Sequence, residues 1–99
     1  GLKFLFYLKI ASFAFSESKI EKVIIPRQIT LIGEKSFHYC QMLKRLEIPN
    51  ESKLQIIDDK AFSESSTKCF YIPRHIRAIC EYAFCYCHHL KILEFDENI

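Results

Sequence analysis

Hydrophobic positions recur along this chain with a fixed period, and the period predicts the architecture. Residues 15–48 and 62–95 are two copies of one pattern, offset by 47 positions, with 17 of 34 aligned residues identical. Each copy divides again, because four phenylalanines are separated by 22, 25 and 22 residues: Phe15, Phe37, Phe62 and Phe84. The basic unit is therefore about 23 residues long and occurs roughly four times. A period of this length is typical of stacked units that share one core.

Each unit contains a short segment that predicts a β-strand. Residues 46–48 and 92–95 alternate in a way that suits a strand with one buried face. A proline follows in three units and ends the pairing, because proline has no backbone N–H. We expect parallel strands at 23–25, 46–48, 70–72 and 93–95, stacked about 4.8 Å apart. A small residue before each phenylalanine predicts a turn or short helical turn that packs closely on the next coil.

The spacing of these positions resembles a known repeat. The pattern IxxIxxxSFxxCxxLxxLxIP at 29–49 returns as IxxIxxxAFxxCxxLxxLxFD at 76–96, and it looks like the BspA-type leucine-rich repeat over about residues 10–96. Four residues depart from the pattern: Ser18, Ser65, Thr67 and Asp96. The resemblance implies an α/β repeat solenoid, a leucine-rich-repeat right-handed superhelix of about four 22–25-residue coils with a parallel strand ladder and short helical turns. It also implies a non-enzymatic protein–protein interaction module of a surface or secreted protein, active in adhesion or recognition.

The chain is expected to form a single repeat domain over residues 1–99. Residues 1–9 fall outside the repeat register, and neither end resembles the polar capping unit that solenoids need. We therefore interpret the sequence as a fragment of a longer array, flanked by further repeats of the same chain, and expect the isolated fragment to self-associate. The apolar N-terminal run is interrupted by Lys9, which favours repeat over secretory signal and predicts no membrane insertion in this segment.

The charge of the chain is nearly balanced, with 14 Lys and Arg against 12 Asp and Glu. No basic run exceeds two residues. This pattern argues against a nucleic-acid partner, which requires a basic stripe or a recognisable binding module.

Five cysteines raise the question of disulfides and metal. Cys40 and Cys87 occupy the same repeat position two coils apart, roughly 10 Å, which exceeds the span of a disulfide. We expect all five thiols to be free, with Cys40 and Cys87 buried in equivalent environments as small hydrophobes. The cluster of Cys80, Cys85, Cys87, His88 and His89 does not have the spacing of zinc ligands, and no group around it resembles a catalytic site. We therefore expect no metal, no cofactor and no enzymatic activity.

The repeat geometry predicts where a partner would bind. Residues between the buried strand positions point outward and form two columns along the ladder. The candidate contact residues are Lys22, Arg45, Cys69 and Ile92 in one column, and Ile24, Glu47, Tyr71 and Glu94 in the other. Their mixed basic, acidic and aromatic character is compatible with a protein partner of unknown identity.

Two functions remain open from the sequence. One is an interaction module of a cell-surface or secreted protein, and the other is a structural spacer solenoid in a larger, possibly intracellular, protein. Asn50 begins a glycosylation sequon, which favours an extracellular location. Free cysteines favour a reducing compartment instead.

Overall fold

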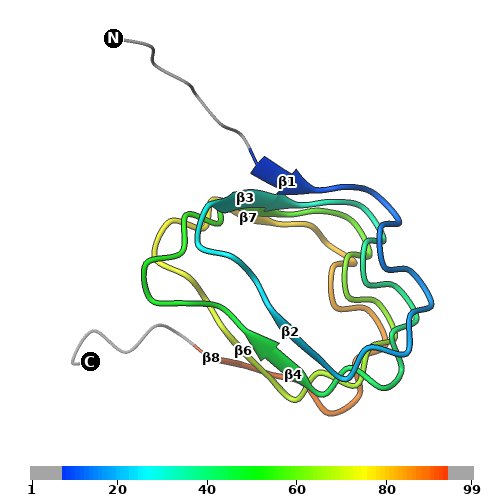
Figure 1. Cartoon of the computed structure of the whole chain (residues 1–99). Helices are drawn as coiled ribbons and strands as arrows, with labels where there is room; N and C mark the ends of the chain where they lie inside the picture. Colours follow the sequence, from blue (N-terminus) through cyan, green and yellow to red (C-terminus); the bar gives the residue numbers. More distant parts are fainter. Residues whose placement is uncertain (1–7, 94–99) are drawn as a thin grey trace, which may run out of the picture.

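Two rows of short parallel strands run along a β-solenoid of about four coils. The computed structural model describes residues 8–93. Figure 1 shows the coils stacked behind one another, with the two strand rows on different sides of a shared interior. The predicted number of coils and the predicted parallel direction of the strands are confirmed, and each coil supplies one layer of the core.

The first row contains the strands that the alternating pattern predicts. It consists of β2 (Lys22–Ile24), β4 (Arg45–Glu47), β6 (Cys69–Tyr71) and β8 (Lys91–Leu93). Three of these strands begin one residue before the predicted position, and β8 begins two residues before it. The prediction of one continuous ladder in this row was also wrong. β2 pairs with β4 and β6 pairs with β8, while β4 and β6 belong to separate sheets.

The second row is continuous and was not predicted as strands. It contains β1 (Leu8–Ile10), β3 (Ile29–Ile32), β5 (Ile56–Ile57) and β7 (Ala78–Ile79), paired in that order. β1 pairs with β3 with a register shift after Leu8, so the strand array begins before Ile10. The apolar positions of this row are spaced by three residues in the sequence pattern. They therefore lack the two-residue alternation that predicts a strand.

The short helical turns expected beside the phenylalanines are absent from residues 8–93. The segments 12–17, 34–39, 59–64 and 81–86 are instead irregular turns. Seven of their residues have a left-handed φ near +60°: Phe13, Glu17, Lys35, Tyr39, Lys60, Glu64 and Tyr86. An α-helix needs consecutive right-handed residues, so a left-handed residue every four or so positions prevents one.

The turn segments form a third hydrogen-bonded ladder. Within each segment, alternate amides donate back along the same coil, as Ser16 does to Phe13 (3.1 Å). The amides between them donate to the following coil, as Phe15 does to Ser36 (2.7 Å). The backbone of every turn is thereby used twice, once to close its own coil and once to fix the next one.

Stacked phenylalanine rings fill the interior, as the sequence predicts. Phe15, Phe37, Phe62 and Phe84 follow one another with ring centroids 5.2, 5.1 and 5.3 Å apart and nearly parallel planes. Phe37 and Phe62 are completely buried, whereas Phe15 at the first coil is 45% exposed. The two middle coils therefore hold the best-packed part of the core.

Two departures from the repeat pattern compensate for one another. Ser65 stands where the repeat has cysteine, and Thr67 stands where it has an aliphatic side chain. Both are buried, and their hydroxyl groups are hydrogen-bonded to each other at 2.9 Å. Because each hydroxyl satisfies the other, the third coil holds two polar side chains in its core without leaving either one unpaired.

Candidate functional site

The outward residues of β2, β4 and β6 lie where the sequence places them. Lys22, Ile24, Arg45, Cys69 and Tyr71 are all exposed. Parallel pairing puts Lys22 beside Arg45 and Ile24 beside Glu47, so the two predicted columns exist across β2 and β4. These strands bring together basic and apolar groups on one face.

The last coil departs from the predicted columns. Ile92 is in register with the buried Phe70, and Lys91 is in register with Cys69. Lys91, rather than Ile92, therefore continues the column of Lys22, Arg45 and Cys69. Glu94 lies outside the described residues.

Glu47 connects the first two strands of the face. Its Oε1 atom lies 3.5 Å from Nζ of Lys22 on β2 and 3.1 Å from Nη2 of Arg45 on its own strand. All three side chains are substantially exposed, so these ion pairs contribute little to stability. Two cations share one carboxylate, and this part of the face therefore keeps a net positive charge.

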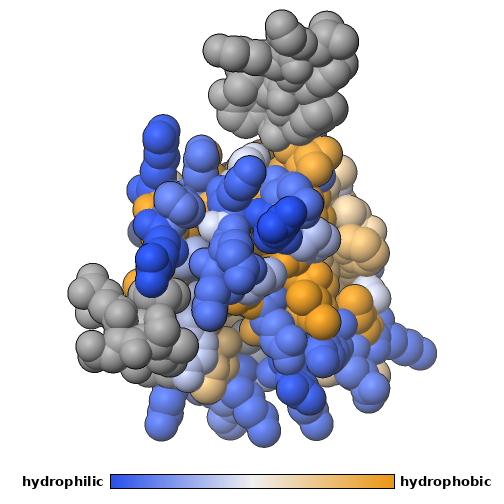
Figure 2. Space-filling view, turned by 60° about the vertical axis from the view of Figure 1, so that its left-hand side comes forward, coloured by the Kyte–Doolittle hydropathy of each residue, from blue (hydrophilic) through white to orange (hydrophobic). Residues whose placement is uncertain are grey.

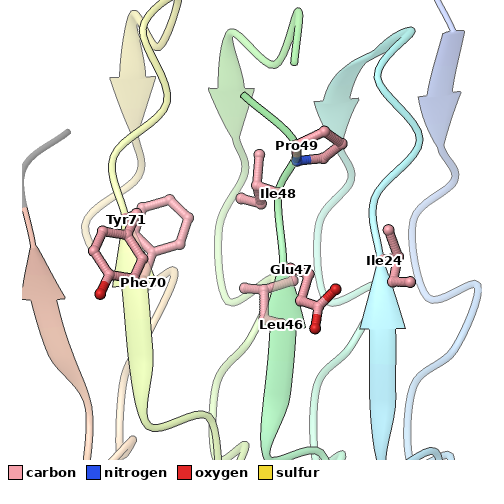
Figure 3. Close-up of a pocket in the computed structure, with 7 residues that line it drawn as sticks. All are labelled: Ile24, Leu46, Glu47, Ile48, Pro49, Phe70 and Tyr71. Atoms are coloured by element: carbon pink, nitrogen blue, oxygen red, sulfur yellow. The ribbon is translucent and has the colours of Figure 1, made fainter. Parts of the chain in front are cut away.

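An apolar groove, called here the β4–β6 groove, lies along β4 and β6 and reaches Ile24 of β2. It has a volume of about 390 Å³, and its walls are Ile24, Leu46, Glu47, Ile48, Pro49, Phe70 and Tyr71. Figure 3 shows the two aromatic rings of β6 on one side, the side chains of β4 and of the segment after it in the middle, and Ile24 of β2 beyond them. Ile24 and Tyr71 are 54% and 57% exposed, so apolar surface at both borders is open to a partner.

The groove lies where the strand ladder is interrupted, and the lengths of the connecting segments differ there. Residues 48–55 join β4 to β5, whereas residues 25–28 join β2 to β3 and residues 72–77 join β6 to β7. The longer connection contributes Ile48 and Pro49 to the groove. The inward residue of β6 is Phe70, whose ring packs on Phe84 of the last coil at 4.9 Å. β6 is thus paired with β8 and packed on the last coil, which leaves its other edge free toward β4.

The cysteine and histidine cluster does not form a metal site. Within residues 8–93, no three His, Cys, Asp or Glu side chains are placed to hold a metal ion. A second hollow of about 280 Å³ contains Glu64, Tyr86, His88 and His89. Its lining residues carry polar side chains, and none of them also lines the groove.

The described cysteines are free and fall into different environments. Cys40 and Cys87 make equivalent hydrogen bonds, from Sγ to the carbonyl oxygens of Phe15 (3.1 Å) and Phe62 (3.0 Å). Their burial is not equivalent, because Cys40 is completely buried and Cys87, in the last coil, is only partly so. Burial raises the pKa of the Cys40 thiol.

Two further groups have altered acidity. Burial raises the pKa of the Cys80 thiol, and the neighbouring Asp58 carboxylate adds to the effect. A hydrogen bond to the Glu64 carboxylate raises the pKa of the Tyr39 hydroxyl. All three shifts favour the neutral form, so none of these groups is activated as a nucleophile or base.

A comparison with protein families identifies the repeat. The family model described as "BspA type Leucine rich repeat region (6 copies)" matches residues 8–99. The chain belongs to the BspA-type leucine-rich repeat family. Repeats of this kind generally serve as protein-interaction modules rather than as enzymes. No curated protein sequence matches the chain.

Solved structures of bacterial leucine-rich repeat proteins have the same fold. A leucine-rich repeat protein from Bacteroides capillosus is 24% identical with a TM-score of 0.76, and the match covers 89% of this chain and 63% of that protein. A leucine rich cell surface protein from Faecalibacterium prausnitzii is 28% identical with a TM-score of 0.77, and the match covers 88% of this chain and 23% of that protein. The pneumococcal vaccine antigen PcpA is 27% identical with a TM-score of 0.84, and the match covers 91% of this chain and 23% of that protein. The BspA-type chain thus spans less than two thirds of each of these structures.

The surface of the BspA-type coils mixes polar and apolar groups. Figure 2 shows hydrophobic patches between hydrophilic side chains on one side of the molecule. Residues 8–93 contain no helix with the length and hydropathy needed to cross a bilayer.

Proposed function

We propose that this BspA-type domain binds a protein partner on the outward face of β2, β4 and β6, with the β4–β6 groove as its anchor. The observation that carries the proposal is the groove itself, an apolar hollow of about 390 Å³ lined by residues of β2, β4 and β6 and of the segment after β4. Protein interfaces commonly have an apolar, aromatic centre surrounded by polar groups. Tyr71 supplies the aromatic group, and Lys22 and Arg45 supply the polar border.

The charges beside the groove define the partner's chemistry. Lys22 and Arg45 both contact Glu47, so the border has two positive charges and one negative charge. A partner that inserts an apolar side chain into the groove beside Tyr71, and places a carboxylate against Arg45, satisfies both the hollow and the charge. We therefore expect an acidic group next to the anchoring side chain.

The proposed setting is the cell surface or the extracellular space, with a role in adhesion or recognition. Two similar structures support this setting, one named as a cell surface protein and the other as a vaccine antigen. Asn50 of the glycosylation sequon is exposed in the turn after Pro49.

Binding to an array of purified secreted and cell-surface proteins tests the proposal. The unchanged chain is compared with Tyr71→Ser in the groove and with Tyr82→Ser, a matched control at a 47% exposed tyrosine of the last turn segment. The dissociation constant for a specific partner should rise about tenfold or more for Tyr71→Ser, the range for an aromatic anchor, and stay unchanged for Tyr82→Ser.

Two results would contradict the proposal. Equal affinity of the unchanged chain and Tyr71→Ser for a specific partner would exclude the groove as the anchor. Failure to bind any protein of the array specifically would favour a spacer solenoid whose coils only set a distance.

A further inference from the structure

We infer that the β4–β6 groove takes a tyrosine side chain of the partner, bound through its ring and its hydroxyl group together. The site is the anchor proposed above, so a tyrosine there rests on the proposed function and specifies the partner. Two features of the chain point to this side chain. One is the apolar lining of the groove, and the other is a set of backbone hydrogen bonds that join β2 to β4 but are absent between β4 and β6.

Backbone hydrogen bonds close the boundary between β2 and β4 beyond both ends of the strands. Before β4, the amides of Lys44 and Arg45 donate to the carbonyl of Glu21, at 3.0 and 3.4 Å. After β2, the amide of Ile25 donates to the carbonyl of Glu47 at 2.9 Å. The backbone groups that the first coil turns toward the second are therefore paired along the whole length of these strands.

The corresponding groups are unpaired at the boundary between β4 and β6. In the repeat, Ile48 takes the place of Ile25, because each precedes a proline. Tyr71 likewise takes the place of Glu47. Within residues 8–93 the Ile48 amide donates no hydrogen bond, to the Tyr71 carbonyl or to any other group, and the Lys68 amide donates none either. By their equivalence with the paired groups of the first boundary, the Ile48 donor and the Tyr71 acceptor point toward one another without being joined.

The unjoined donor and acceptor belong to residues that line the groove. Figure 3 shows Leu46 and Ile48 on one side and the rings of Phe70 and Tyr71 on the other. Ile48 is only partly exposed. An amide in such a position is costly to leave unpaired, so an occupant that accepts its hydrogen bond gains free energy beyond the burial of apolar surface.

These walls and backbone groups together select the occupant. The walls favour a flat apolar body, while the tip has to accept a hydrogen bond from the Ile48 amide and donate one to the Tyr71 carbonyl. A phenol has an apolar ring and a single oxygen atom that both donates and accepts. Phenylalanine and leucine have no polar tip, tryptophan only donates, and asparagine and glutamine lack the aromatic body. Tyrosine is therefore the side chain that satisfies both requirements.

The border of the groove adds an acidic neighbour to this tyrosine. Lys22 and Arg45 share the single carboxylate of Glu47, and the Arg45 side chain is 68% exposed. Its guanidinium group has further N–H donors for a second carboxylate. The expected partner is a protein that exposes a tyrosine next to an aspartate or glutamate.

Titration of the chain's amide resonances with three short peptides tests this inference. The peptides share the blocked sequence Gly-Asp-X-Gly, in which X is tyrosine, phenylalanine or O-methyltyrosine. The tyrosine peptide should bind about tenfold more tightly than the phenylalanine peptide, because its hydroxyl group pairs two backbone groups that phenylalanine leaves unpaired. The O-methyltyrosine peptide, which has lost the donor, should bind no more tightly than the phenylalanine peptide. The tyrosine peptide alone should move the Ile48 amide proton downfield, as a new hydrogen bond does.

Two variants locate the binding, and their amide spectra also show whether they are folded. Tyr71→Ser removes a wall of the groove and should weaken binding of the tyrosine peptide about tenfold. Tyr82→Ser, which changes an exposed tyrosine outside the groove, should bind like the unchanged chain.

Equal dissociation constants for the tyrosine and phenylalanine peptides would overturn the inference, even where Tyr71→Ser weakens both and confirms the groove as an apolar anchor. A tyrosine peptide that leaves the Ile48 amide unshifted would overturn it as well. The protein array described above tests the proposed function separately, because it does not depend on which side chain enters the groove.

Discussion

The rings of Phe37 and Phe62 lie 5.1 Å apart and within 1° of parallel, although 25 residues separate them in the sequence. Each ring is completely buried, and each contacts another phenylalanine on its far side. This relationship joins the second and third coils at their centres, across the same boundary where β4 and β6 are not paired. The ring stack therefore holds together the two halves of the outward strand row.

Removal of a central ring should nearly unfold the chain. Phe37→Ala should lower the free energy of unfolding by about 3–5 kcal/mol, because it leaves a cavity between two stacked rings. The total stability of a chain of this size is on the order of 5–10 kcal/mol. Phe15→Ala, at the open end of the same stack, should cost less than half as much. Urea unfolding measures both values, and equal shifts of the two midpoints would show that the stack has no central core.

The sequence predicts the solenoid because the residues that fill its core repeat. Phe37, Phe62 and their equivalents recur at the coil period, and this spacing alone gives the stacking order and the parallel direction of the strands. The sequence does not reveal the second strand row, because its strands are two to four residues long and do not alternate.

The candidate face was predicted in part. The columns of Lys22 with Arg45 and Ile24 with Glu47 follow from strand alternation. The groove does not follow from strand alternation. It depends on the absence of hydrogen bonds between β4 and β6, and the residues of a strand have a similar propensity whether or not the strand is paired. The sequence feature nearest the groove is the lengthened segment after Pro49. In the chain, that segment lies almost one coil before β6.

Left-handed residues in the turns predict a stabilising substitution. Lys60 has a φ of 55°, which strains a residue with a Cβ, and its side chain makes no hydrogen bond or ion pair with residues 8–93. Lys60→Gly should raise the free energy of unfolding by about 1 kcal/mol, because glycine adopts this conformation without a steric cost. Lys53→Gly is the control, since Lys53 is exposed and has no left-handed φ, and it should be destabilising. A loss of stability for both variants in urea would mean that the turns are not strained.

The buried thiol of Cys40 predicts a loss of stability in alkali. Burial raises the pKa of this thiol above the ordinary value of 9.0. The contribution of Cys40 to stability is therefore complete below pH 9 and is lost as the pH rises through the folded-state pKa, because the unfolded thiol ionises first. Between about pH 8 and pH 10, the free energy of unfolding should fall more for the unchanged chain than for Cys40→Ala. Cys69→Ala, which removes an exposed thiol, should behave like the unchanged chain. The same dependence of stability on pH in the unchanged chain, Cys40→Ala and Cys69→Ala would contradict a contribution from the buried Cys40 thiol.

Residue-resolved amide hydrogen exchange tests most directly whether the outward face is divided by a groove. The amides of Lys44 and Lys91 donate across the strand row, to Glu21 at 3.0 Å and to Lys68 at 2.8 Å. The amide of Lys68 precedes β6 as that of Lys44 precedes β4, and it donates no hydrogen bond within residues 8–93. We expect the Lys68 amide to exchange about tenfold faster than the Lys44 amide or more, because exchange requires an opening only where a hydrogen bond exists. Equal protection of Lys44 and Lys68 would mean that β4 and β6 are paired, and it would remove the groove on which the proposed binding site depends.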